Sequence, residues 1–137
     1  MPLQEYVWVP PFSRVEIVGR AASFLGLEVA RTPSAWAEHK TTCLDLVVGV
    51  YGWPEPAPRT WAEIDRMVPG IIDATGWSYV SRTTPVAGDL LVFEVRGPHL
   101  GVCIGLDRFI HCGAIRVTEA SLSRYQTYLQ GVVSWDF

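Results

Sequence analysis

Apolar residues near the N-terminus recur with the spacing of a helix that packs on one side. The four residues from Ser13 to Glu16 form a capping box, in which the serine and glutamate satisfy each other's backbone amides. Phe12 and Ile17 flank the box as a hydrophobic staple. The pattern predicts a helix over residues 14–25 that ends at Gly26. Its expected apolar face consists of Val15, Val18, Ala22 and Leu25.

A second helical pattern lies in the stretch TTCLDLVVGVYG, residues 41–52. Thr42 is expected at the N-cap, with Asp45 three residues later, and Gly52 ends the helix. The apolar positions that repeat with helical spacing are Leu44, Val47, Val48 and Tyr51. This helix is therefore expected to pack into the core.

The pattern changes to strands after a short third helix. A capping box over residues 60–63 opens that helix, and Pro69-Gly70 closes it. From Trp77 onward short apolar or alternating runs are separated by Gly, Pro and Asp. The predicted strands are 77–80, 90–95, 99–105, 108–113, 114–118 and 132–137, with an amphipathic segment at 122–129 before the last one. Helices followed by a mostly antiparallel sheet indicate the α+β fold class.

Composition and charge narrow the class of protein. The 137 residues are 49% hydrophobic, which suits one domain over residues 1–137, with residues 1–12 as an N-terminal extension. The formal net charge is -3 and charged residues are interspersed, so we expect no nucleic-acid partner. The sequence shows neither a secretory signal nor a long apolar stretch, so we expect synthesis in the cytoplasm and no membrane insertion.

The three cysteines form neither an even disulfide set nor a CxxC zinc pair. We therefore expect at least one free thiol. We also expect no cofactor. Cys43 falls in the first turn of the second helix, where unpaired backbone amides and the helix dipole favour an anion and lower the thiol pKa. The same position also suits a buried cysteine without a chemical role. Whether Cys43 is reactive or only structural therefore depends on whether a histidine is available as a base.

A nucleophilic thiol needs a base, and the base needs a partner that orients it. His99 and His111 lie in two successive predicted strands, and in an antiparallel hairpin centred near Gly105 they fall opposite each other. Alternation puts Gly101 on the same face as His99, where its small size leaves room for an approaching helix end. His39 is expected to be a solvated loop residue.

The same alternation bears on metal binding. It sends Cys112 to the face opposite His111, so Cys43, His99, His111 and Cys112 do not form a compact zinc shell. We therefore expect no metal site.

A cysteine that opens a helix, then PVAGDLLVF, then HLGVCIGLDRFIHCG occur in this order within residues 43–113. This series resembles the NlpC family of cell-wall cysteine peptidases, which has a papain-like core. The resemblance implies that fold, with Cys43 as the nucleophile, His99 as the general base and His111 as the residue that orients His99. It also implies peptidoglycan stem peptides as the substrate.

Two stretches, CLDLVVGVYG and GVVSWDF, resemble the short NlpC-type peptidases encoded among the tail genes of tailed phages and gene transfer agents. This narrower resemblance implies incorporation into a virion or particle tail tip, with tail-tip or baseplate hub proteins as partners. The aromatic segment EYVWVPPF, within the N-terminal extension, is a candidate docking segment for such a partner.

The residues beside Cys43 depart from the family pattern. Thr42 stands where an aspartate commonly precedes the nucleophile, and Leu44 and Asp45 stand where the family has a small residue pair ending in glycine. A Tyr-x-x-Gly-Gly-like stretch of the family is also replaced, by TPSAWAEHK. Two alternatives therefore stay open: a structural tail-tip subunit with a vestigial cleft, and an amidase or acyltransferase that uses the same cysteine and histidine chemistry.

Overall fold

The computed structural model describes residues 10–29, 43–53, 84–95 and 98–134. Two helices, α1 (Arg14–Ala22) and α3 (Cys43–Tyr51), precede a sheet. Its strands are β1 (Leu90–Glu94), β2 (Pro98–Gly105), β3 (Arg108–Cys112), β4 (Val117–Ser121) and β5 (Leu129–Val133). A short helix α5 (Leu122–Tyr125) and a 3-10 helix η2 (Gln126–Tyr128) join β4 to β5. The predicted third helix, the strand at 77–80, the cap at Thr42 and His39 lie outside the described residues.

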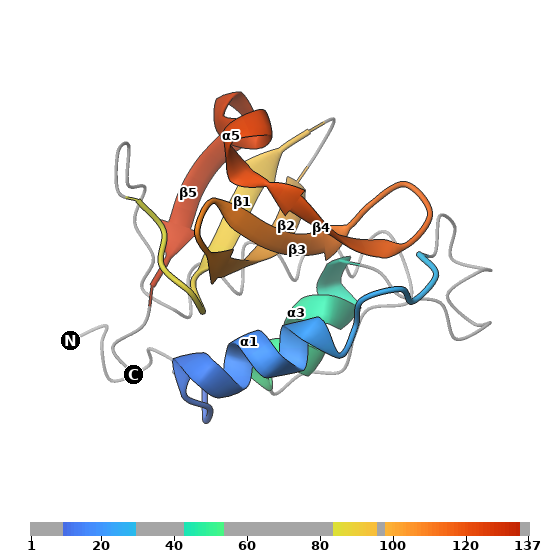
Figure 1. The fold of residues 1–137 in the computed structure, drawn as a ribbon, viewed down its shortest axis with the longest axis vertical. Helices are drawn as coiled ribbons and strands as arrows, with labels where there is room; N and C mark the ends of the chain where they lie inside the picture. Colours follow the sequence, from blue (N-terminus) through green and yellow to red (C-terminus); the bar gives the residue numbers. More distant parts are fainter. Residues whose placement is uncertain (1–9, 30–42, 54–83, 96–97, 135–137) are drawn as a thin grey trace, which may run out of the picture.

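The five strands form one antiparallel sheet in the order β4-β3-β2-β1-β5. α1 and α3 pack against each other and against one face of this sheet, and α5 lies on the opposite side (Figure 1). Helices packed on an antiparallel sheet confirm the predicted α+β class.

α1 begins as the sequence predicts and ends earlier. The Ser13 hydroxyl accepts the Glu16 N–H at 3.2 Å, and a Glu16 carboxylate oxygen accepts the Ser13 N–H at 3.1 Å, which confirms the capping box. The helix ends at Ala22 rather than near residue 25. Both the backbone N–H and the hydroxyl of Ser23 bond back to the carbonyl of Arg20, so the chain leaves the helix there.

The buried face of α1 is not the predicted one. Val15 is 83% exposed, whereas Ile17 and Ala21 are buried. Phe12 packs against the core cluster that contains Ile17, as expected of a hydrophobic staple. The staple therefore sets the rotation of the helix, because the residue paired with the flanking aromatic ring faces the core and Val15 faces solvent.

α3 ends where the sequence predicts, at a glycine. Gly52 has a φ of 71° and donates its N–H to the Val48 carbonyl at 3.0 Å. Among the α3 residues whose side chains the structure describes, the buried ones are Leu46, Val47, Val50 and Tyr51. Only the second and fourth of these belong to the predicted stripe, because α3 contacts α1 as well as β2 and β3 and is therefore buried over a wider arc.

The first three strands agree with their predicted ranges to within one residue, and the last two are shifted. β4 begins at Val117 instead of residue 114 because the preceding chain pairs elsewhere: Ile115 accepts the Val29 N–H at 2.8 Å. β5 begins at Leu129, earlier than predicted, because it pairs with β1 from that residue onward. The amphipathic segment between them is helical, as α5 and η2.

Alternation along the strands separates two apolar clusters, one on each face of the sheet. The helix-facing cluster includes Leu100, Val102, Ile110 and Cys112, together with residues of α1 and α3. The opposite cluster includes Leu91, Phe93, Cys103, Phe109 and Leu122. The predicted alternation of β2 is therefore confirmed, and the two faces of β3 are clearly distinguished.

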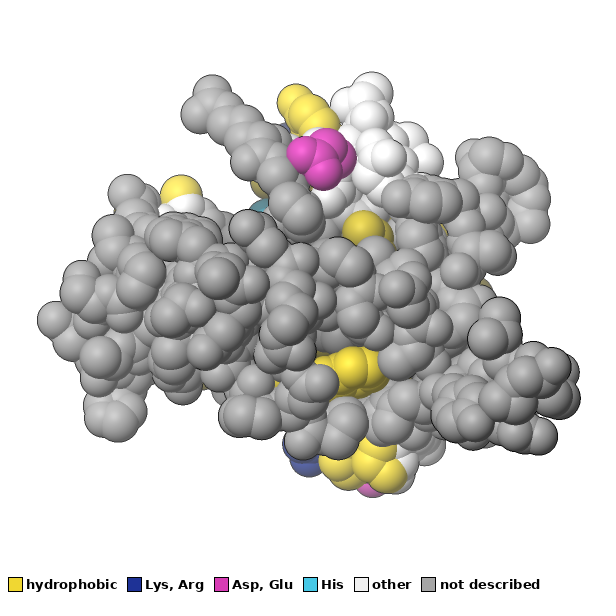
Figure 2. Space-filling model, turned by 180° about the vertical axis from the view of Figure 1, so that it is seen from behind, with side chains coloured by type: hydrophobic (Ala, Val, Ile, Leu, Met, Phe, Trp, Pro, Cys, Tyr) yellow, Lys and Arg dark blue, Asp and Glu magenta, His cyan; other side chains and the backbone are white. Residues whose placement is uncertain are grey.

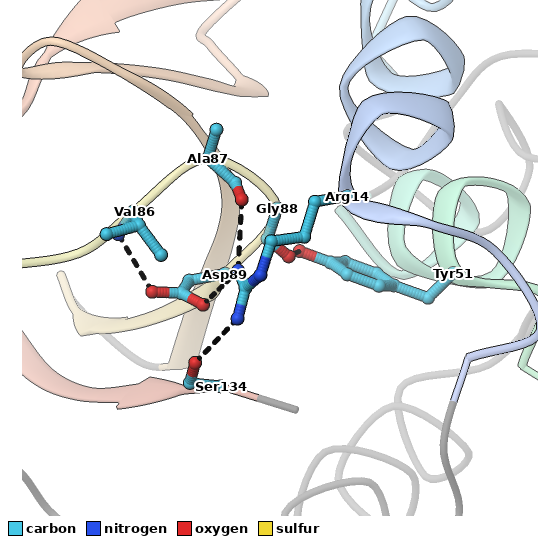
Figure 3. A network of polar contacts seen from close by, with 7 residues as sticks. All are labelled: Arg14, Tyr51, Val86, Ala87, Gly88, Asp89 and Ser134. Atoms are coloured by element: carbon cyan, nitrogen blue, oxygen red, sulfur yellow. Dashed lines mark hydrogen bonds and ion pairs between the residues drawn. The ribbon is translucent and has the colours of Figure 1, made fainter. Parts of the chain in front are cut away.

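A buried carboxylate links the start of β1 to distant parts of the chain (Figure 3). Asp89 is 2% exposed, and its Oδ1 accepts from Arg14 Nη1 at 2.9 Å. The same guanidinium donates to the Ala87 carbonyl at 3.0 Å and to Ser134 Oγ at 3.1 Å. Asp89 Oδ2 accepts the Val86 N–H at 2.9 Å. The network therefore joins α1, the turn before β1 and the end of β5.

The same turn is held from the other side by α3 and β2. Tyr51 donates its hydroxyl hydrogen to the Gly88 carbonyl at 3.0 Å (Figure 3). Gly88 and Asp89 each exchange a backbone hydrogen bond with Cys103, at 2.8 and 2.9 Å. Gly88 has a φ of 98°, and a Cβ there would lie 3.1 Å from Arg14 Cγ, so this position suits glycine for two reasons.

The described surface seen from behind mixes side chains of several kinds. Figure 2 shows hydrophobic, acidic and basic side chains of the described residues as separate small patches. Exposed apolar side chains also come from different elements, among them Val15 on α1, Leu106 in the β2–β3 turn and Tyr128 in η2. No helix among the described residues has the length and apolar character needed to cross a membrane.

Arg14→Ala is expected to lower the free energy of unfolding by about 2–4 kcal/mol, because the Asp89 carboxylate stays buried without the guanidinium charge. Urea unfolding followed by circular dichroism measures the loss. The matched control is Arg108→Ala, which removes an arginine from a 3.0 Å pair with Glu119 whose two side chains are 43% and 41% exposed. The control should lose less than about 1 kcal/mol. Equal losses in the two variants would contradict a dominant role for the buried pair.

Candidate active site

β2 and β3 bring His99 and His111 into direct contact. Nε2 of His99 lies 2.8 Å from Nδ1 of His111, a hydrogen-bond distance. Both rings contact aromatic residues of the sheet face opposite α1 and α3, His99 meeting Phe93 and His111 meeting Phe109. The predicted contact between the two imidazoles is therefore present.

The register of the hairpin differs from the prediction. The turn residues are 106–107, with φ values of 50° and 63°, so the hairpin is not centred at Gly105. His111 lies opposite Gly101, and His99 stands two residues earlier on the same face. The prediction that the two histidines are directly opposite was wrong. The rings still meet because diagonal cross-strand neighbours are within reach of long side chains.

Gly101 has a different role from the predicted one. A Cβ at this position would lie 2.9 Å from Phe109 Cδ2 and 3.3 Å from the Ile110 carbonyl oxygen. The space beside His99 is thus filled by an aromatic ring of β3, and not by a helix end. A larger residue at 101 would clash with this ring, whose centroid lies 4.8 Å from that of His111.

Burial keeps both imidazoles neutral at neutral pH. It lowers the pKa of His111 to about 4, with the charge of a protonated His99 as the second cause. Burial also lowers the pKa of His99. Between two neutral rings, one must donate and the other accept. When His99 Nε2–H donates to His111 Nδ1, the Nδ1 lone pair of His99 remains to take a proton, as a general base requires.

Cys43 is the first residue of α3 and is half-buried, whereas Cys103 and Cys112 are buried. Burial raises the pKa of the Cys103 thiol. It also raises the pKa of the Cys112 thiol, to which negative charges on Cys43 and Asp45 contribute further. The first turn of a helix acts in the opposite direction, because its N–H groups favour a thiolate. Of the three thiols, Cys43 is the least buried and is the one at a helix start.

A hollow of about 200 Å³ lies beside the histidine pair. Its lining residues are Val95, His99, His111, Cys112, Gly113, Ala114 and Tyr125. Cys43 packs against the core cluster that contains Cys112, and its charge acts on the Cys112 thiol. The structure therefore joins the two histidines directly and places Cys43 beside Cys112, the residue that follows His111 along β3.

Successive side chains of β3 face opposite sides of the sheet next to the hollow. Cys112 belongs to the helix-facing cluster while His111 contacts rings on the opposite face, as the alternation of β3 predicts. Within the described ranges, no group of three or more histidine, cysteine or acidic side chains is arranged to hold a metal ion.

Tyr125 is a site residue that the sequence analysis missed. It lies on α5, lines the hollow, and its ring centroid is 5.3 Å from that of His111. The signal available in the sequence was the amphipathic segment at residues 122–129, which interrupts the predicted strands. Nothing in that pattern says which of its aromatic residues reaches the histidines.

Two helices packed on a five-stranded antiparallel sheet, with a cysteine at a helix start and paired histidines on neighbouring strands, form an NlpC/p60-like fold, as expected. A solved crystal structure, that of the NlpC/p60 domain of the peptidoglycan hydrolase SagA, matches this chain with a TM-score of 0.60. The match covers 90% of this chain and 100% of that one, at 18% sequence identity, so the likeness is one of fold. No protein-family model and no curated protein sequence matches the chain.

The free energy of unfolding is expected to fall as the pH is lowered from about 6.5 to about 4. His111 has a pKa of about 4 in the folded protein, against an ordinary value of 6.5, so in this window the unfolded chain binds a proton that the folded chain does not. The destabilisation is absent above about pH 6.5 and grows as the pH falls toward about 4. Its slope is at most about 1.4 kcal/mol per pH unit for one proton. Urea unfolding of the wild type and of His111→Gln across this range measures it. The variant should show a shallower slope, and identical slopes would contradict the depressed pKa.

Proposed function

We propose that this chain is a cysteine peptidase that cleaves peptide bonds in peptidoglycan stem peptides. One observation carries the proposal: in an NlpC/p60-like fold, His99 and His111 share a 2.8 Å hydrogen bond, and the half-buried Cys43 begins a helix packed on the same sheet. The solved domain of this fold carries the name of a peptidoglycan hydrolase. Cys43 is the nucleophile, His99 the general base, and His111 the residue that orients the base.

The reaction follows from these roles. His99 takes the proton of Cys43, which gives a thiolate and an imidazolium. The thiolate attacks the carbonyl carbon of the scissile amide, and the resulting oxyanion accepts a hydrogen bond from the Cys43 backbone N–H at the start of α3. His99 gives its proton to the leaving amine, and a thioester remains on Cys43. Water, deprotonated by His99, then hydrolyses the thioester and restores the thiol.

The low pKa of His111 suits it to orient the base without taking the base's proton. Its pKa is about 4, and a positive charge on His99 acts to lower it. When His99 becomes an imidazolium, its Nε2–H therefore continues to donate to Nδ1 of a neutral His111. This bond limits rotation of the His99 ring, so the opposite nitrogen keeps one direction through the cycle.

Cys43→Ala is expected to lower the rate of muropeptide cleavage by on the order of 10⁴-fold or more, because it removes the atom that forms the thioester. His111→Ala should slow the reaction less, on the order of 10²-fold, because the base remains but is poorly oriented. Mass spectrometry of purified muropeptides incubated with each variant measures the products and their rates.

The control in this assay is Cys103→Ala, which removes a buried thiol that is not at a helix start and should retain cleavage. A wild type that cleaves no muropeptide across several wall chemotypes would overturn the peptidase proposal in favour of a structural subunit. A parallel reaction with an added amine acceptor distinguishes hydrolysis from acyl transfer. Products that carry the acceptor in place of water would assign an acyltransferase with the same nucleophile.

We also propose that the peptidase works at the tail tip of a phage or gene-transfer-agent particle. The support is the resemblance of CLDLVVGVYG and GVVSWDF to short peptidases encoded among tail genes. In that setting the enzyme opens the cell wall during DNA delivery. Peptide mass spectrometry of purified particles and of particle-free lysate tests this setting. Peptides of this chain should co-purify with tail-tip proteins, and their confinement to the particle-free fraction would contradict it.

A further inference from the structure

We propose that Tyr125 is a positioning residue: its ring packs on His111 from outside the β2–β3 hairpin and keeps that imidazole turned toward His99. The catalytic meaning of this inference rests on the proposed peptidase function. Its structural part concerns the histidine pair alone and can be measured without a substrate.

His111 has ring neighbours on several sides. Its ring centroid lies 5.0 Å from that of His99, with an interplanar angle of 88°, and 4.8 Å from that of Phe109. Tyr125 adds an edge contact at 5.3 Å and 70°. Of these three rings, Tyr125 is the one from a separate element, because His99 and Phe109 belong to the same hairpin as His111. It therefore limits the movement of the imidazole away from the sheet.

Tyr125 is itself fixed by rings of the sheet. Its centroid lies 5.3 Å from that of Phe109 and 6.0 Å from that of Phe93, in edge-to-face arrangements at 86° and 66°. Such arrangements are the favoured ones for aromatic pairs. The ring is thus held by two neighbours while it presses on a third, as a positioning role requires.

The helix that carries Tyr125 is fastened to the turn of the histidine hairpin. Asp107, in that turn, accepts the Ser121 hydroxyl at 2.7 Å and the Ser123 N–H at 2.9 Å with its two carboxylate oxygens. Its backbone carbonyl accepts the Leu122 N–H at 2.7 Å. These bonds fix the start of α5 relative to β3. Tyr125 is the last residue of α5, so its position is fixed with that of the helix.

Tyr125 lines two hollows, so the alternative to a positioning role is that its ring forms a wall against which substrate binds. One is the histidine hollow, and the other, of about 500 Å³, is lined by Arg108, Glu119, Ala120, Ser121, Arg124 and Tyr125. If Tyr125 were only a wall against which substrate binds, its loss would raise KM. A positioning residue instead lowers kcat, because the base is misoriented in every bound complex.

The test compares Tyr125→Leu and Tyr125→Phe with the matched control Tyr128→Leu. Tyr128 follows in η2, is 44% exposed and meets the Tyr125 ring at 6.3 Å. Two measurements are made on each protein: NMR titration of the His111 imidazole, and kcat and KM for muropeptide cleavage.

In Tyr125→Leu the pKa of His111 should rise from about 4 by at least about one unit, because water reaches a ring that burial had kept neutral. Its kcat should fall on the order of 10-fold or more, with KM within about twofold. Tyr125→Phe and Tyr128→Leu should match the wild type in both measurements, because the former keeps the ring and the latter leaves it in place. Asp107→Asn, which removes one carboxylate oxygen at a positive φ that asparagine tolerates, should shift both quantities in the same direction by less.

An unchanged His111 pKa in a folded Tyr125→Leu would overturn the inference, as would a raised KM with an unchanged kcat. If Tyr125→Leu does not fold, Asp107→Asn decides, and a wild-type titration in that variant counts against the proposal. If the wild-type protein cleaves no muropeptide, the proposed function fails, while the titration still decides whether Tyr125 holds His111.

Discussion

The ion pair between Arg14 and the buried Asp89 is the contact on which the arrangement of this molecule depends. Arg14 belongs to the first turn of α1, and Asp89 stands immediately before β1. The same group of residues reaches the end of β5 through Ser134, and the neighbouring Gly88 reaches α3 through Tyr51. A carboxylate this deeply buried is tolerable only when it is paired and hydrogen-bonded, so the elements that supply its partners must all be in place.

The consequences of this contact extend to the site through the backbone. Gly88 and Asp89 bond to Cys103 on β2, and β2 carries His99 at its other end. On the neighbouring strand, Cys112 takes part in the helix-facing cluster that α3 covers, while His111 joins the aromatic rings on the opposite face. Successive side chains of β3 therefore face opposite sides of the sheet. Burial raises the pKa of the Cys112 thiol on one side and lowers the pKa of the His111 imidazole on the other.

The parts of this structure that could be predicted from the sequence are those set by local chemistry. The capping box at Ser13, the glycine stop at Gly52 and the ranges of β1 to β3 follow from neighbouring residues and agree with the structure. The rotation of α1 could not be predicted in this way. Its sequence has apolar residues on two adjacent faces, and tertiary packing decides which face is buried. The register of the hairpin differed for a related reason. The turn forms at residues 106–107, and nothing in the pattern distinguishes it from a turn centred one residue earlier.

The two halves of the candidate site differ in how the chain brings them together. The histidines are 12 residues apart in sequence and meet within one hairpin, whereas α3 is held against the sheet by contacts between distant segments. A contact of short sequence separation closes a shorter loop, and so costs less chain entropy, than a contact between distant segments. The contact between His99 and His111 therefore closes at a lower entropic cost than the packing of α3 on the sheet. Under the function proposed above, the pairing of the Cys43 thiol with its base would then depend on the docking of α3, and the chain would gain its reactivity only with its completed core.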